Sequence, residues 1–161
     1  MNNPDLQAAQ AAIDKAVKPA DRQAYDRIVV AGMKVMFSKQ THNQIFQGLE
    51  GAQDPVALTA EGAAGLMLML REQSRNTMPM GPMIMAGQSL LLEALDFIEQ
   101  GGLAQIKVDK AVIAQATQHY IETILPKIGM TPEKMQATIG QTQGVMNDPK
   151  KMAAFKQSMG G

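Results

Sequence analysis

Residues 54–100 read DPVALTAEGAAGLMLMLREQSRNTMPMGPMIMAGQSLLLEALDFIEQ, and this stretch sets the class of structure. Asp54-Pro55 and Gly81-Pro82 each place a proline directly after a residue that favours helix caps. Proline loses nothing at the first helical position, where its missing N–H would have no partner. Two long apolar segments follow these signals, and a short polar turn separates them. The pattern predicts an antiparallel helical hairpin over residues 55–100.

The same pair of a capping residue and a proline recurs on both sides of the hairpin, at Asn3-Pro4, Thr131-Pro132 and Asp148-Pro149. Apolar residues at three- and four-residue steps predict further helices over 4–17, 20–37 and 109–128. A break over 39–43, followed by a short helical turn, is expected after the second helix. The sequence therefore predicts an all-α bundle of about five main helices over residues 1–128. Two short helices are expected in a loosely packed tail, residues 129–161.

The composition narrows the chemistry that is open to the 161-residue chain. It has 15 Lys and Arg against 15 Asp and Glu, and no cysteine or tryptophan. A formal charge of zero argues against a protein that binds nucleic acid through phosphate contacts. The lack of cysteine removes disulfides, thiolate nucleophiles and most structural zinc sites. No signal peptide and no transmembrane helix are recognised, so a cytoplasmic location is the general expectation.

No group of residues has the spacing of a catalytic or cofactor site. His42 and His119 are far apart and belong to no paired-ligand motif. Glu93, Asp96 and Glu99 repeat every three residues, and a solvated helix face is the expected explanation for them. The sequence thus predicts no catalytic residue, no cofactor and no enzymatic activity.

Gly62 and Gly65 lie inside the first helix of the predicted hairpin. Glycine in a helix interior costs about 1 kcal/mol relative to alanine. Close packing of a second helix against these two residues is the expected compensation.

Methionine is the most unusual residue type, because six of its 14 copies fall between Met67 and Met85. Three explanations are open: gap filling in a core poor in aromatic residues, an adaptable surface for another protein, or a thioether site for Cu(I). The copper site would comprise Met78, Met80, Met83 and Met85. The residues predicted to contact a partner are Leu6, Ile13, Met78, Met80, Met83, Met85, Met152 and Phe155.

The distribution of residue types along the whole chain supports a resemblance to a class of proteins. It combines an Ala- and Gln-rich start over residues 6–12, a Met-rich middle, and a tail that ends Lys156-Gln157-Ser158-Met159-Gly160-Gly161. In these features the chain resembles the small helical virion proteins of tailed bacteriophages, which include connectors, capsid-interior proteins and ejection proteins. The resemblance implies a structural role in many copies, without catalysis, and a location in the virion.

The leading prediction is therefore a non-enzymatic assembly protein whose partners are copies of itself and other structural proteins. One alternative is a membrane-active helical hairpin that inserts as an oligomer, because small residues at 62–65 and 86–87 also suit helices that associate in lipid. The other alternative is the methionine-rich Cu(I) protein.

Overall fold

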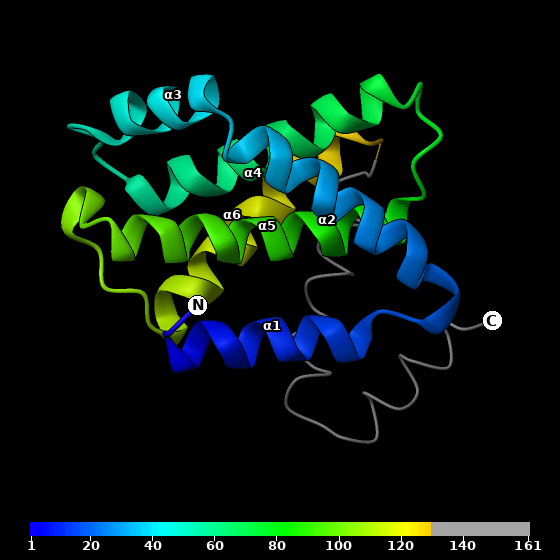
Figure 1. The fold of residues 1–161 in the computed structure, drawn as a ribbon, viewed down its shortest axis with the longest axis horizontal. Coiled ribbons are helices and arrows are strands. Elements are labelled where there is room, and N and C mark those ends of the chain that lie inside the picture. The colour runs from blue at the N-terminus through cyan, green and yellow to red at the C-terminus, as the bar shows by residue number, and fades with distance from the viewer. Residues whose placement is uncertain (130–161) are drawn as a thin grey trace. The chain divides into compact units, whose positions relative to one another are not determined.

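Six α-helices and two short 3₁₀ turns form residues 1–129, the part of the chain that this computed structural model describes, and no strand occurs in that part (Figure 1). The predicted all-α class is confirmed. In order, the elements are α1 (Pro4–Ala16), η1 (Pro19–Asp21), α2 (Arg22–Met36), α3 (Lys39–Leu49), α4 (Pro55–Gln73), α5 (Met80–Gln100), η2 (Leu103–Gln105) and α6 (Lys110–Lys127).

The contacts divide the chain after Ile124 into two units, Met1–Ile124 and Leu125–Gly161. The fold described below is that of the first unit. The predicted tail, residues 129–161, lies outside the described residues except for Gly129.

Short polar side chains start α1 and α4 where the proline and cap signals predicted. The Asn3 side-chain oxygen accepts hydrogen bonds from the backbone N–H groups of Asp5 and Leu6 at the start of α1. Asp54 accepts from the Ala57 N–H at 3.0 Å and so caps α4. These bonds satisfy N–H groups that have no partner within the helix, which is why the helices begin at these residues.

The predicted hairpin of α4 and α5 is confirmed: the two helices pack side by side and run in opposite directions (Figure 1). Arg75 and Asn76 turn the chain between them with left-handed φ angles of 56° and 60°. α5 begins at Met80, two residues before the expected start, so Pro82 lies in its first turn. Proline is tolerated there because no helical hydrogen bond is lost.

α5 is the central helix of the unit, because α1, α2 and α4 all pack against it (Figure 1). The consecutive residues Leu90, Leu91 and Leu92 are all buried, so this helix is covered on several sides. A single stripe through Leu91, Leu95 and Ile98 was predicted, and the burial extends well beyond it.

The expectation that other helices pack closely on Gly62 and Gly65 is wrong. Both glycines are exposed, and a methyl group added to either would meet no atom within 4 Å. Close approach occurs instead at Gly32, where a side chain would collide with Leu90, and at Gly87, where it would collide with Tyr120 and Met67. The two buried glycines therefore set how closely α2, α4 and α6 approach α5.

α3 is the main departure from the predicted element order. The break falls at Phe37 and Ser38, and the helix then runs without interruption from Lys39 to Leu49. Ser38 explains the difference, because its hydroxyl accepts a hydrogen bond from the Thr41 N–H at 3.4 Å and caps the new helix. Only Leu49 of this helix is fully buried.

Candidate interaction surface

An apolar groove lies beneath α3. Its cavity volume is about 270 Å³, and α2, α3, α4 and α5 all contribute to its walls. The groove is lined by Met36, Phe37, Thr41, Gln44, Ile45, Gly48, Leu49, Leu58, Thr59, Gly62, Ala63, Leu66, Ala94, Phe97 and Ile98. No charged side chain is among these residues. We call this feature the α3 groove.

Small residues explain why the α3 groove is not filled by the protein itself. Gly48 on α3, Gly62 and Ala63 on α4, and Ala94 on α5 place almost no side-chain volume in it. Thr59 brings a hydroxyl to the lining, but this group donates a hydrogen bond to the Pro55 carbonyl at 2.7 Å. The groove therefore offers an apolar surface on which the polar atom of Thr59 is already satisfied.

A group of four aromatic rings lies at the edge of the α3 groove. Phe97 of α5 is at its centre, with ring centroids 5.7 Å from Phe37, 4.7 Å from His42 and 6.0 Å from Phe46. Such edge-to-face pairs are favourable arrangements of aromatic rings. Phe37 and Phe46 nevertheless remain 41% and 40% exposed, and Leu58 on the other side of the groove is 38% exposed. Exposed apolar surface of this kind marks interaction sites in many proteins.

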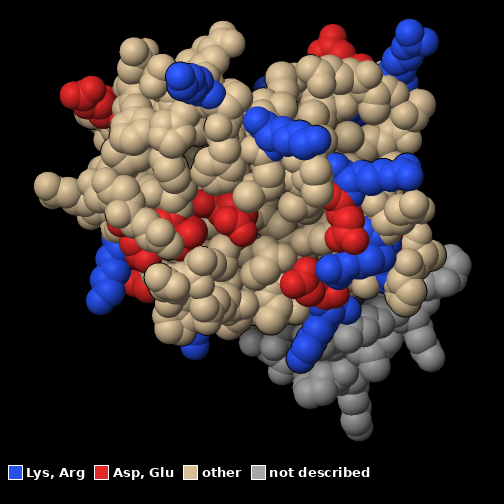
Figure 2. All heavy atoms as spheres, in the orientation of Figure 1, with Lys and Arg blue, Asp and Glu red and all other residues tan. Residues whose placement is uncertain are grey.

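A second hollow is acidic. It lies where the end of α5 and the loop before α6 meet the start of α1, and Asp5, Asp96, Glu99 and Asp109 are among its lining residues. Figure 2 shows acidic side chains gathered in this part of the surface. Among residues 1–129, no group of three or more histidine or acidic side chains is arranged to hold a metal ion.

The carboxylates along α5 do not form the solvated face that was expected. The Asp96 side chain is buried and accepts hydrogen bonds from Gln100. Glu99 accepts from the Asn3 side chain at 2.9 Å and from the Val108 N–H, so it ties the start of α1 to the loop before α6. Burial and the Asp96 carboxylate raise the pKa of Glu93 above its usual value, whereas the charge of the Met1 amino group acts against this rise.

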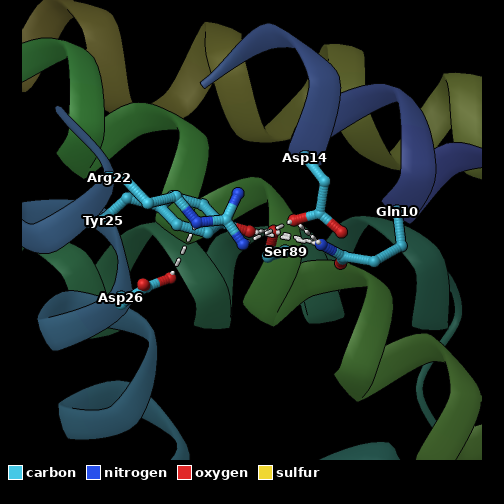
Figure 3. A network of polar contacts seen from close by, with 6 residues as sticks. All are labelled: Gln10, Asp14, Arg22, Tyr25, Asp26 and Ser89. Atoms are coloured by element: carbon cyan, nitrogen blue, oxygen red, sulfur yellow. Dashed lines mark hydrogen bonds and ion pairs between the residues drawn. The ribbon is translucent and has the colours of Figure 1, made fainter. Parts of the chain in front are cut away.

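A buried polar network joins α1 to α2 and α5 (Figure 3). The hydroxyls of Tyr25 and Ser89 are 2.6 Å apart, and the Gln10 amide donates to both at 3.2 Å. Arg22 continues the network at the surface with ion pairs to Asp14 and Asp26. Ser89 lines neither of the hollows described above, and the network ties α1, α2 and α5 together.

Tyr120 is a buried polar residue that the sequence interpretation did not single out. Its hydroxyl donates to the Ile84 carbonyl at 3.2 Å, and burial raises the pKa of the phenol far above its ordinary value. His119 lies beside Glu61 at 3.1 Å and links α6 to α4 near the surface. The other histidine, His42, belongs to the aromatic group at the α3 groove.

The structure places the predicted partner-contact residues in different environments. Leu6 is 0% and Met83 is 1% exposed, so both are core residues, and their prediction as contact residues is wrong. Each lies on the side of its helix that faces the bundle. Met80 is 46% exposed, and Ile13, Met78 and Met85 are half-buried. Met152 and Phe155 lie outside the described residues.

The burial of Met83 also bears on the Cu(I) hypothesis. Met83 could join Met78, Met80 and Met85 in a metal site only by leaving the core. The hypothesis itself stays a prediction. The α3 groove was not predicted at all. The signal that could have indicated it is Gly62, a helical glycine that was assigned instead to close helix packing.

Comparisons of the chain with protein-family models, curated proteins and solved structures give no match. Among the described helices, none has both the length and the apolar character needed to cross a lipid bilayer. A function for this protein is therefore inferred from the surfaces described above.

Proposed function

We propose that this chain is a non-enzymatic assembly protein, which works by contacting other protein chains in a multi-copy particle. The observation that carries the proposal is the α3 groove, an unfilled apolar cavity of about 270 Å³ beside the exposed side chains of Phe37, Phe46 and Leu58. Apolar side chains of another protein would gain free energy by entering it, at roughly 25 cal/mol per Å² of apolar surface removed from water.

The resemblance to the small helical virion proteins of tailed bacteriophages suggests the kind of particle. A connector, capsid-interior or ejection protein acts through surfaces and needs no catalytic group. The copies of this chain and the other structural proteins of such a particle are the proposed partners. The virion is then the proposed location.

The proposal is tested by filling the α3 groove from within. Gly62 lines the groove, and a Cβ atom added to it would have no neighbour within 4 Å, so we expect Gly62→Leu to be accommodated and to occupy the cavity. Gly65→Leu is the matched control, because Gly65 is also exposed on the same helix but is not among the residues that line the groove. The readouts are the fluorescence of a dye that binds apolar surface and the sedimentation of the chain over a range of concentrations.

We expect the unmodified chain to bind the dye, Gly62→Leu to reduce this binding several-fold, and Gly65→Leu to leave it unchanged. Circular dichroism would check that all three proteins are folded. A chain that binds no dye and sediments as a single copy at every concentration would contradict the proposal. Equal dye binding by all three proteins would show that the α3 groove is not the accessible surface.

A further inference from the structure

The outward face of α3 carries four residues at spacings of four, three and four: Lys39, Asn43, Phe46 and Glu50, the last being the C-cap. These spacings place all four on one stripe of a helix with 3.6 residues per turn. All four are exposed. Thr41 and Gly48, which line the groove, lie on the opposite side of the helix. The partly exposed ring of Phe46 also meets Phe97 at the edge of the groove, with 6.0 Å between the ring centroids. We call the outward set the α3 stripe.

The charges at the two ends of the α3 stripe are unfavourable for the helix that carries them. A helix has a partial positive charge at its N-terminus and a partial negative charge at its C-terminus. Lys39 is the first residue of α3 and Glu50 follows its last, so each charge lies beside a helix end of its own sign. The ion pairs found in the part of the chain that the structure describes involve neither residue.

Between these two ends α3 carries no lysine, arginine, aspartate or glutamate. The surface over α3 in Figure 2 is accordingly uncharged between a basic end and an acidic end. A partner surface that complements the stripe must therefore carry a negative group, an uncharged middle and a positive group, in that order. The α3 stripe itself has this order when it is read backwards.

We propose that the α3 stripe binds the α3 stripe of a second copy of this chain, with the two helices antiparallel. Reversal about the midpoint of the stripe pairs Lys39 with Glu50 of the other copy, and Asn43 with Phe46 of the other copy. Two-fold symmetry makes each of these pairs occur twice. Each end charge then lies beside an oppositely charged side chain and beside the favourable end of the other helix. This inference rests on the proposed function, to which it adds a partner, a second copy of the chain, and a contact that is separate from the α3 groove.

The size of α3 predicts a weak and reversible dimer. A helix of 11 residues is about 16 Å long. Contact along such a helix covers less than the roughly 800 Å² per partner that is usual for stable complexes. Burial of the two partly exposed Phe46 rings and the two Lys39–Glu50 charge pairs would hold the copies together at high local concentration, as in a particle that contains many copies. We therefore expect a dissociation constant in the micromolar range or above, as is usual for small interfaces.

The test uses charge reversal of the full chain, measured by analytical ultracentrifugation. Lys39→Glu leaves two acidic ends on the stripe, and Glu50→Lys leaves two basic ends, so either variant alone places like charges opposite each other. We expect each single variant to dimerise at least ~10-fold more weakly than the unmodified chain. An equimolar mixture of the two should recover the dimer, because each acidic end then faces a basic end. The double variant, with both reversals in one chain, should also dimerise.

Two controls keep the result specific. Arg27→Glu and Glu72→Lys change the net charge by the same amounts at exposed residues outside α3, and we expect them to leave dimerisation unchanged. The single variants on α3 should unfold at equal or higher urea concentration, because each places a charge of the favourable sign at its helix end. A loss of dimerisation in these variants is then not a loss of folding.

The outcomes separate this inference from the proposed function. Single variants that dimerise as the unmodified chain does, or a mixture that fails to recover the dimer, would overturn the antiparallel pairing. If the unmodified chain still self-associates and binds the apolar dye in that case, the proposed function stands with a different contact. If the unmodified chain stays a single copy at all concentrations and binds no dye, both proposals fail.

Discussion

Four glycines of this protein show how much the surroundings of a residue decide its role. Gly62 and Gly65 are exposed on α4, with open space where a side chain would project. Gly32 and Gly87 are buried against Leu90 and Tyr120. All four lie inside helices, so each has the same low helix propensity. Only the contacts of the folded unit distinguish the glycines that permit close packing from those that leave a groove.

From these contacts we expect the same substitution, glycine to alanine, to change the free energy of unfolding in opposite directions at two positions. Gly87→Ala should lower the free energy of unfolding by about 1–3 kcal/mol or more, because the methyl group collides with Tyr120 and Met67. Gly65→Ala should raise it by up to about 1 kcal/mol, because alanine favours the helix and nothing lies within 4 Å. Urea unfolding followed by circular dichroism measures both. Equal effects of the two changes would contradict the packing described for α5.

α1 is held in the bundle mainly at a few points. Leu6 is its only fully buried residue. Its start is tied by Asn3, which caps the helix and whose amide also donates to Glu99 and to the Val108 carbonyl at 2.7 Å. Its middle is tied by Gln10, through the network with Tyr25 and Ser89. Polar contacts therefore provide part of the stabilisation of α1, whereas apolar burial holds α5 in place.

Removal of the Asn3 side chain should loosen α1 more than loss of a cap alone. We expect Asn3→Ala to cost about 2–3 kcal/mol, of which about 1 kcal/mol is the cap and the rest the two long-range hydrogen bonds. Asn3→Ser keeps a capping oxygen without the amide donors, so its cost should be intermediate. Urea unfolding gives the stabilities, and hydrogen exchange of the α1 amides shows where protection is lost. An Asn3→Ala protein as stable as the original would rule out this role.

Most helix starts were predictable because caps, prolines and apolar spacing act over a few residues. Asn3, Asp54 and Asp109 all cap helices where the sequence indicated. The start of α3 was misplaced because the Ser38 cap was not recognised as a helix start. A helix start that is set by a cap and a proline in neighbouring positions can therefore be predicted from the sequence, whereas a cap formed by a single serine in a polar stretch is easily overlooked.

Burial and the candidate site were harder to predict, because they depend on which helices meet. Leu6 and Met83 were predicted to contact a partner because of the segments around them, yet both side chains are buried in the bundle. The α3 groove draws its walls from four helices that are separated in sequence, and its emptiness results from small residues on three of them. No local pattern records such an arrangement. The periodicity of one helix shows that it has an inner face, but not which neighbour covers it.

At the level of the whole unit, the protein combines a well-packed centre with one incompletely packed corner. α5 is covered by three helices, and no buried side-chain nitrogen or oxygen of the described residues lacks a hydrogen-bond partner. Around α3, in contrast, two phenylalanines are exposed beside an empty apolar groove. This contrast supports the proposed assembly role, because the centre would keep the fold while the corner stays available to other chains.

The mass of the assembly that contains the untagged, full-length protein in its native source tests this account most directly. Gentle lysis, size separation and mass spectrometry of the fractions would locate the chain. We predict that it elutes with an assembly many times heavier than one copy, together with other structural proteins, and that this association is lost in Gly62→Leu or in the charge-reversal variants of α3. A chain that elutes as one free copy, at native concentration and in every fraction, would contradict the account.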